Sequence, residues 1–250
     1  MDGFNTLNHN ERLNWLRLSR SENIGPITFF QLIRRFGTAE AALDAVPELA
    51  RRGGRKRPIR LLDPSKVEQE AEAIADAGAH LLAACEPAYP TALAAIPDAP
   101  PVLTVLGRTE LLGGQDTPTV GIVGARNASG AGRRIAQGIA TDLGGRGIIV
   151  ASGLARGIDT SAHNGALKTG TIAVVAGGVD VFYPPENEDL QIAIGTQGAV
   201  ISEQPMGTQP QARHFPRRNR LISGLSMGVL VVEAAARSGS LITARTALEQ

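Results

Sequence analysis

Residues 119–153 read "TVGIVGARNASGAGRRIAQGIATDLGGRGIIVASG" and carry the clearest structural pattern in the chain. The two ends of this stretch are apolar throughout, which is typical of strands covered on both faces. Between them, Ser129 stands where a helix N-cap belongs and Gly144 stands where a helix ends. A strand, a helix and a second strand at this spacing predict a βαβ unit with parallel strands.

The same pattern continues on both sides of this unit. Further apolar runs, separated by Gly-rich turns or helical segments, lie at 102–107, 171–178, 198–203 and 227–235. They predict the fold class α/β, with an extended Rossmann-like, doubly wound parallel sheet over residues 66–250. In the helix that follows the second strand, Asp159 is expected to be the N-cap, and the role of a general base is open to it as well.

A small all-α domain is predicted for residues 1–65. Apolar residues at helical spacing flank a tight turn at Gly25 and Pro26, which suggests a helix-hairpin-helix or SAM-like unit. Such a unit either presents its turn amides to a DNA phosphate or serves only as a packing module. Residues 51–60, "RRGGRKRPIR", are interpreted as a basic linker or exposed loop, with nucleic-acid contact as an open alternative.

The composition excludes several classes of protein. The chain has 250 residues with 25 basic and 24 acidic side chains, so its net charge of +1 does not indicate a polyanionic partner. Aromatic residues make up only 4%, which argues against a broad base-stacking surface. With a single cysteine, Cys85, and no suitable histidine spacing, neither a disulfide nor a metal site is expected. The sequence shows no signal peptide and no apolar run of membrane length, which predicts a cytoplasmic protein.

The ligand edge of such a sheet lies at the carboxyl ends of its strands, where this chain has loops rich in Gly and Ser. Loop amides and helix N-termini at that edge predict a surface for phosphates. The G-x-G-x-x-G fingerprint and the P-loop are both absent, so NAD and ATP are disfavoured, no cofactor is predicted, and a mononucleotide stays open. No nucleophile with an activating base is found. Glu233, at the end of an apolar run, is either a catalytic carboxylate or one that holds a loop.

The loops together resemble the DNA-processing protein A family, DprA or Smf. The matching segments, in order, are GARNASGAG, SGLARGIDTSAHNGAL, TIAVVAGGVDVFYPPEN, SEQPMG, HFPRRNRLISGLS and VVEAAARSGSLITA. The resemblance implies a non-enzymatic protein, without catalytic residues, that binds single-stranded DNA in natural transformation and protects it. It further implies that the protein helps to load RecA recombinase for DNA recombination and that it forms a homodimer.

The resemblance places the DNA contacts in these loops. The DNA-binding residues expected are Gly124, Arg126, Ser152, Gly153, Leu154, Ala155, Gly157, Phe215, Arg217, Arg218, Asn219 and Arg220. The carboxylates of Asp159, Glu203 and Glu233 are expected to structure the loops. Phe215 and Tyr183 are the aromatic side chains available for stacking on bases.

The cluster Arg217, Arg218 and Arg220 has no carboxylate among its neighbours from 214 to 226. We expect its guanidinium groups to gather beside Arg126 at the carboxyl edge of the sheet and to meet phosphates there. The alternative for each of them is an ion pair with Glu203 or Glu233.

Two departures from the family pattern are visible. Many relatives carry a basic residue after the Tyr-Pro pair, where this chain has Pro185 and Glu186. Many relatives also continue into a further strand, and some into a winged-helix domain, which are not expected within the sequence to Gln250. The rival function is a nucleotide N-glycoside hydrolase of the lysine-decarboxylase-like kind, in which Glu233 or Asp159 would act on a nucleotide. The signature P-G-G-x-G-T-x-x-E of that family is missing.

Overall fold

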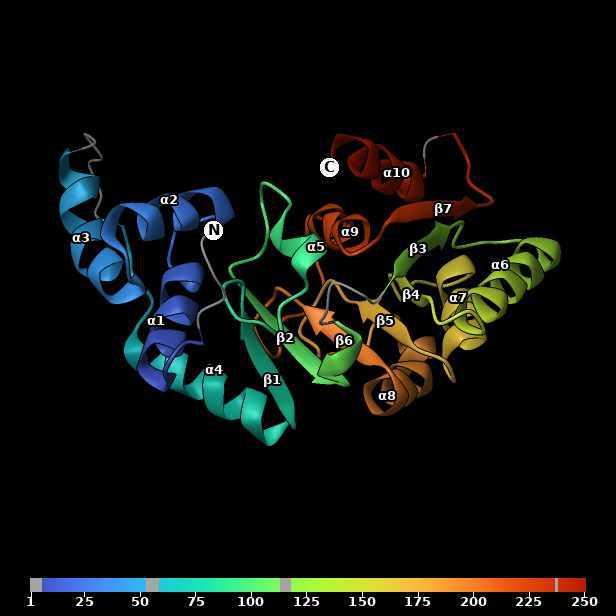
Figure 1. Cartoon of the computed structure of the whole chain (residues 1–250), viewed down its shortest axis with the longest axis horizontal. Coiled ribbons are helices and arrows are strands. Elements are labelled where there is room, and N and C mark those ends of the chain that lie inside the picture. The colour runs from blue at the N-terminus through green and yellow to red at the C-terminus, as the bar shows by residue number, and fades with distance from the viewer. Residues whose placement is uncertain (1–5, 53–58, 113–117, 237) are drawn as a thin grey trace.

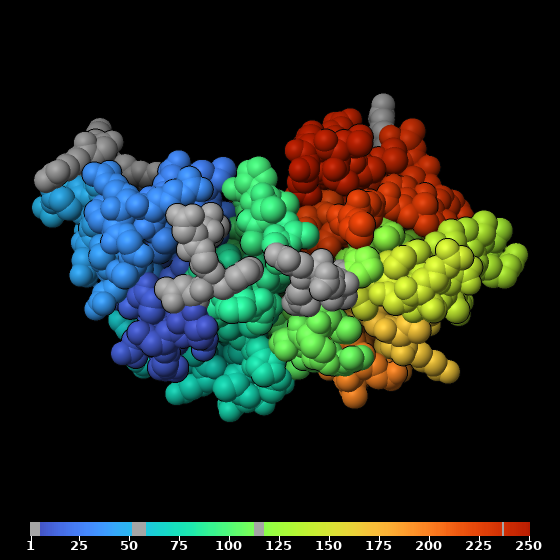
Figure 2. Space-filling model, in the orientation of Figure 1, coloured from blue at the N-terminus to red at the C-terminus, as the bar shows by residue number. Residues whose placement is uncertain are grey.

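The structure, a computed structural model, describes residues 6–52, 59–112, 118–236 and 238–250. The predicted basic loop at 51–60 falls largely outside these ranges. Among the residues described, four helices precede the sheet and form one end of the elongated molecule (Figures 1 and 2). They are α1 (His9–Arg20), α2 (Pro26–Phe36), α3 (Ala39–Arg52) and α4 (Pro64–Asp76).

The sequence explains the boundaries of these helices. Asn8 caps α1 by accepting a hydrogen bond from the Glu11 amide at 2.8 Å. Pro26 begins α2, and Gly37 ends it with a φ of 84°, which glycine adopts without steric cost. The buried core runs without a break from these helices to the sheet. The division of the chain into residues 1–65 and 66–250 therefore stays a prediction.

Within the described parts of the chain, seven strands form one sheet in the order β1-β2-β6-β5-β4-β3-β7 (Figure 1). The strands are β1 (Ala79–Ala83), β2 (Val102–Gly107), β3 (Thr119–Gly124), β4 (Ile149–Ser152), β5 (Thr171–Val174), β6 (Ala199–Ser202) and β7 (Gly228–Val232). The α/β class and the Rossmann-like, doubly wound arrangement are confirmed.

One strand differs from the predicted parallel sheet. β2 pairs antiparallel with β1 on one side and with β6 on the other. An apolar run shows that a strand is buried, but its direction depends on the connections. Residues 84–101, between β1 and β2, contain only the short helix α5 (Thr91–Ala94) and no full crossover helix, which is the connection an antiparallel pair allows.

Helices cover both faces of the sheet, as the apolar strands require. In β3, Ile122 packs toward one core, and Val123 packs toward the core shared with the N-terminal helices. The remaining helical segments are η1 (Thr109–Leu111), α6 (Gly130–Gly144), α7 (Ile158–Ala166), η2 (Pro185–Asn187), α8 (Glu188–Gln197), α9 (His214–Gly224) and α10 (Gly239–Glu249). No helix among the described residues is long and apolar enough to cross a membrane.

The basic segment that begins at residue 214 was expected to be a ligand-facing loop and is the helix α9. Its Pro216 lies in the first turn, where the missing amide hydrogen costs no intrahelical bond. Since successive residues of a helix are about 100° apart, the arginines at 217, 218 and 220 cannot all point the same way.

Candidate nucleic-acid interface

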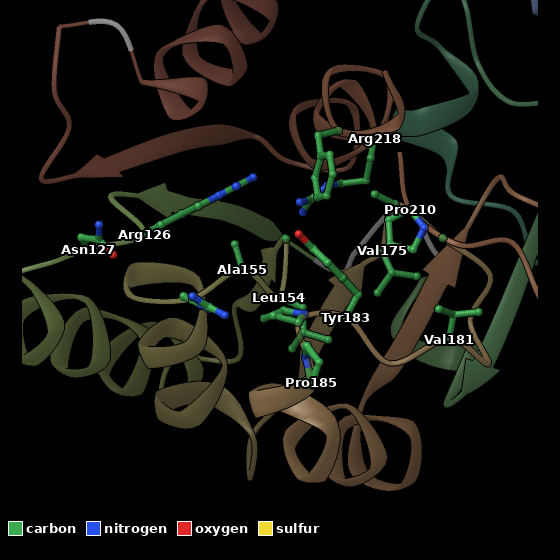
Figure 3. A pocket seen from close by; sticks show the side chains of 16 residues that line it. Arg126, Asn127, Leu154, Ala155, Val175, Val181, Tyr183, Pro185, Pro210 and Arg218 are labelled. Carbon is green, nitrogen blue, oxygen red and sulfur yellow. The ribbon is translucent and has the colours of Figure 1, made fainter. Parts of the chain in front are cut away.

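A pocket of about 340 Å³ opens at the carboxyl ends of β3, β4 and β5; we call it the sheet-edge pocket. Arg126 and Asn127 line it from the β3–α6 loop, and Tyr183 lines it from the loop after β5. Phe215 and Arg218 reach it from α9. In Figure 3 the side chains of Arg126, Tyr183 and Arg218 converge on the same space.

The rings and the cation of this pocket contact one another. The guanidinium carbon of Arg126 lies 5.2 Å from the centre of the Phe215 ring, and the Phe215 ring lies 5.7 Å from the Tyr183 ring. Tyr183 is 45% exposed, so one aromatic surface stays open to solvent. Arg126 is exposed, and no carboxylate in the described parts of the chain forms an ion pair with it. A free cation beside an open ring suits a phosphate and its adjoining base.

Arg218 lies beneath this surface, with only 5% of the residue exposed. Its Nη1 donates to the carbonyl of Val174 at 3.0 Å. A Cβ on Gly153 would come within 1.5 Å of that nitrogen, so a larger residue there would displace the Arg218 guanidinium from this position. Burial lowers the pKa of Arg218 to about 10, and the nearby Asp159 carboxylate opposes that shift. Arg218 therefore contributes charge to the pocket from a fixed, buried position.

Asp159 does not cap its helix, so that prediction is wrong. Gly157 is the N-cap of α7, and Asp159 lies inside the first turn. Its buried carboxylate turns back and accepts hydrogen bonds from the Gly153 and Ala155 amides at 3.2 and 3.3 Å. Burial raises the pKa of Asp159 to about 6, and the Arg218 charge is the largest effect that opposes the rise.

Glu233 holds the loop that carries Arg126. Its carboxylate accepts hydrogen bonds from the Ser129 amide at 2.9 and 3.1 Å and from the Ser129 hydroxyl at 2.7 Å. Its carbonyl accepts from the Ala125 amide at 2.7 Å, so both ends of the loop are tied to one residue. Glu233 has a φ of 51°, a left-handed conformation that costs a non-glycine residue energy. The hydrogen bonds from Ser129 hold the pKa of Glu233 below its usual value.

These two carboxylates change the expected role of the loop amides. The amides of Gly153, Ala155 and Ser129 were expected to hold phosphates, but Asp159 and Glu233 already occupy them. These three amides are therefore not free for a phosphate, which leaves the guanidinium of Arg126 and the rings of Phe215 and Tyr183 as the main candidates to meet a ligand at the sheet-edge pocket.

Other expected residues mainly shape the backbone around the pocket, and among them Leu154 also lines it. Ser152 is fully buried and donates to the Ile122 carbonyl at 2.6 Å. Leu154 is fully buried with a φ of 53°, and its carbonyl accepts from the Asn187 side chain at 2.9 Å. Gly157 has a φ of 79°, and a Cβ there would meet the carbonyls of Ala125 and Arg126. Gly124 likewise leaves no room for a Cβ, which would lie 1.9 Å from the Val232 carbonyl.

The arginines of α9 divide between two pockets. Arg217 and Arg220 line a second pocket, of about 690 Å³, on the side of the N-terminal helices; we call it the junction pocket. Arg220 forms ion pairs with Glu203 and with Asp98, the latter at 3.2 Å. Arg217 is exposed. The single cluster expected beside Arg126 is therefore not observed, because the helix turns Arg217 and Arg220 away from Arg218.

Glu203 connects the junction pocket to the N-terminal helices. Its carbonyl accepts from Arg20 at 2.9 Å, and Arg20 also pairs with Glu70 on α4 at 2.9 Å. Burial raises the pKa of Glu203, although Arg220 opposes the rise more than any other group. Asn219 donates to the Gly239 carbonyl at 3.4 Å and so joins α9 to α10.

Sequence reasoning missed several residues of these pockets. Arg156 lines the sheet-edge pocket and pairs with Glu186, the residue that replaces the basic group of many relatives. Asp98 and Arg20 lie in segments without any motif, so only the fold brings them to Arg220 and Glu203. Within the described residues, no group of three His, Cys, Asp or Glu side chains could hold a metal ion.

The fold and the pocket define a class of protein: a Rossmann-like α/β domain behind a helical hairpin unit, with cations and rings at its ligand edge. The model of the DNA recombination-mediator protein A family matches residues 80–250, and that of the DprA-like N-terminal HHH domain matches residues 9–73. The chain belongs to the DNA recombination-mediator protein A family.

Individual relatives agree with this assignment. Protein Smf of Synechocystis sp. is 38% identical over 96% of this chain and 63% of its own length. The X-ray structure of DNA processing protein A from Streptococcus pneumoniae has a TM-score of 0.65 and 34% identity, covering 90% of this chain and 84% of that one. A structure of DNA processing protein A from Helicobacter pylori, described for its single-stranded DNA binding mode, has a TM-score of 0.62 and 32% identity, covering 68% of this chain and 76% of that one. The chain spans less than two thirds of the length of the curated relatives from Synechocystis sp., Streptococcus pneumoniae and Escherichia coli that it matches.

Proposed function

We propose that this protein binds single-stranded DNA, without sequence preference, along the carboxyl edge of its sheet. The observation that carries the proposal is the contact between Arg126 and Phe215, which sets a free guanidinium beside the exposed ring of Tyr183. Phosphates of a flexible strand reach the guanidinium while its bases stack on the rings. The Helicobacter pylori relative, described for the same ligand, supports this reading.

The wider role is proposed from membership of the family. The protein protects incoming DNA in natural transformation and helps to load RecA recombinase on it, acting as a homodimer in the cytoplasm. The proposal includes no catalysis, because the acids considered for a hydrolase have structural roles: Asp159 holds the Gly153 and Ala155 amides, and Glu233 holds Ser129. Co-sedimentation with RecA on poly-dT and sedimentation velocity of the protein alone test the partner and the dimer.

The central test compares the binding of single-stranded and duplex DNA, and a parallel assay measures the release of free base from nucleotides. Fluorescence anisotropy is expected to show tighter binding to poly-dT than to a duplex of equal length at the same salt, because a rigid duplex cannot bring both phosphate and base to one small pocket. Duplex binding of equal strength would refute the proposal. In parallel, no free base is expected to be released from nucleotides. Base release that is lost in Glu233→Gln would establish the hydrolase instead.

A further inference from the structure

A third pocket, of about 690 Å³, lies where the connections of the sheet change direction; we call it the switch-point pocket. The strands after β3 progress to one side through β4 and β5, whereas β7 lies on the other side of β3. Rossmann-like sheets bind small ligands at such a point, outside the carboxyl ends of the strands. This pocket adjoins the sheet-edge pocket, and Arg126, Phe215 and Arg218 are among the residues that line both. Its volume is that of an ordinary small-molecule site.

The first turn of α10 forms one wall of the switch-point pocket. Ser238 is the N-cap of this helix of 11 residues, but its side chain makes no capping bond. Its hydroxyl instead pairs with that of Ser240 at 2.7 Å, and both serines line the pocket. Two hydroxyls and the positive end of a helix therefore face the same space, an arrangement that suits an anion.

Buried polar groups of the same pocket provide a second, independent indication. Thr243, 1% exposed, lines the pocket, and its Oγ1 has no hydrogen-bond partner among the described residues. Arg218, 5% exposed, lines it too, and its Nε likewise has no partner there. Buried hydroxyl and guanidinium groups are almost always hydrogen-bonded. Two such groups around one cavity indicate that its polar partner is a ligand.

The same pocket also offers hydrogen-bond acceptors. Glu233 lines the pocket with an exposed carboxylate that also holds Ser129. The Asp159 carboxylate lines it as well, but it is buried and engaged with loop amides. Dinucleotide-binding sheets likewise hold a sugar hydroxyl with an accessible carboxylate in the site that binds the phosphates. The pocket therefore combines groups for a phosphate with an acceptor for a sugar.

We propose that the switch-point pocket binds a nucleoside 5′-monophosphate. Its phosphate lies between Arg126 and the serines at the start of α10, and its sugar lies toward Glu233. The ligand is either a free nucleotide or the 5′-phosphorylated end of a strand. The proposal goes beyond strand binding at the sheet-edge pocket, because the phosphate is held by α10, which does not line that pocket.

Calorimetric titration of the protein with AMP, dAMP and adenosine tests the proposal, together with anisotropy of oligo-dT with and without a 5′-phosphate. Binding of AMP or dAMP at least about tenfold tighter than adenosine identifies a free nucleotide, since a charge-assisted hydrogen bond is worth about 1.5–3 kcal/mol. A preference only for the 5′-phosphorylated oligonucleotide identifies a strand end. No effect of the phosphate in either experiment overturns the proposal.

Variants of α10 locate the site. Ser240→Ala is expected to weaken the binding of the preferred phosphorylated ligand about tenfold, and Thr243→Val about fivefold. Each variant removes one hydrogen bond to the ligand. The matched control is Thr246→Val, one turn further along, whose hydroxyl donates to the Ile242 carbonyl at 3.0 Å and which lines the junction pocket. Equal losses in all three variants overturn the proposal. Anisotropy with long poly-dT is expected to stay unchanged in them, so a failure of strand binding is recognised separately.

Discussion

The two sides of α9 use the same residue types in opposite ways. On the sheet side, the carboxylate of Asp159 accepts loop amides, and Arg126 stays unpaired within the described residues. On the side of the N-terminal helices, the carboxylates of Glu203 and Asp98 accept Arg220 directly. The sheet-edge pocket therefore keeps a free positive charge on Arg126, whereas in the junction pocket two carboxylates neutralise the charge of Arg220. In this fold, an arginine is available to bind a ligand only where the neighbouring carboxylates are held by other partners.

The largest expected effect is the loss of stability on replacing Arg218, compared with Arg217 on the other side of α9. Arg218→Met removes the cation that most favours the charged form of the buried Asp159, and it also removes the hydrogen bond to the Val174 carbonyl. Removing a buried cation that supports a buried carboxylate is expected to cost about 3–5 kcal/mol of unfolding free energy. The exposed Arg217→Met is the matched control and is expected to change that free energy by less than about 0.5 kcal/mol. Urea unfolding followed by circular dichroism measures both, and similar midpoints for the two variants would show that Arg218 is not part of the core.

The prediction from sequence worked where local chemistry decides the structure. Ser129 caps α6 by accepting from the Gly132 amide at 3.0 Å, and the apolar strands lie in one sheet as expected. It failed where partners come from distant segments. The acidic partners of Arg220 lie after α5 and after β6, so the cluster at 217–220 gave no sign of how its members would divide. Asp159 failed as a cap because the buried loop before it offered amides that a solvent-exposed N-cap would not meet.

On the sheet side of α9, Asp159 is expected to make the stability of the fold depend on pH. Its pKa of about 6 in the folded protein lies above the unfolded value of 3.8, so its contribution to stability is present at low pH and is lost as pH rises through 6. Burial lowers the pKa of His163 to about 3, so its contribution has the opposite sign and is lost as pH falls below 6.5. The two oppose each other between pH 4 and 6.

Asp159→Asn removes one of these opposing contributions. The variant is expected to gain up to about 3 kcal/mol more unfolding free energy than the parent between pH 4 and pH 6, the equivalent of a shift of about two pKa units. Urea midpoints at the two pH values measure this difference. Parallel pH profiles for variant and parent would mean that Asp159 is charged throughout the range.

Measurements of single-stranded DNA binding are expected to distinguish the unpaired Arg126 from the ion-paired Arg220. Arg126→Ala is expected to weaken poly-dT binding about tenfold and to make the salt slope shallower by about 0.7, the value for one phosphate contact on a single strand. Arg220→Ala should leave the salt slope unchanged and instead lower the unfolding free energy by roughly 2 kcal/mol, since it leaves the buried Glu203 without its main cation. Anisotropy at several salt concentrations, with melting curves for both variants, distinguishes these roles. A shallower slope in Arg220→Ala would show that its ion pairs open for DNA.

Among the arginines discussed, Arg217 is expected to have the smallest effect on the binding of single-stranded DNA. It is exposed like Arg126, yet it lines the junction pocket, where the Glu203 carboxylate lies close enough for Arg217 to lower its pKa. A strand confined to the sheet edge would feel this charge only across solvent, which screens it within about 10 Å at 0.1 M salt. Arg217→Ala is therefore expected to weaken poly-dT binding by only about twofold to threefold at low salt and to match the parent at 0.2 M salt. Lengthening the oligonucleotide adds a second measurement. If the loss grows to that of Arg126→Ala with longer strands, the DNA crosses α9 and the junction pocket is part of its path.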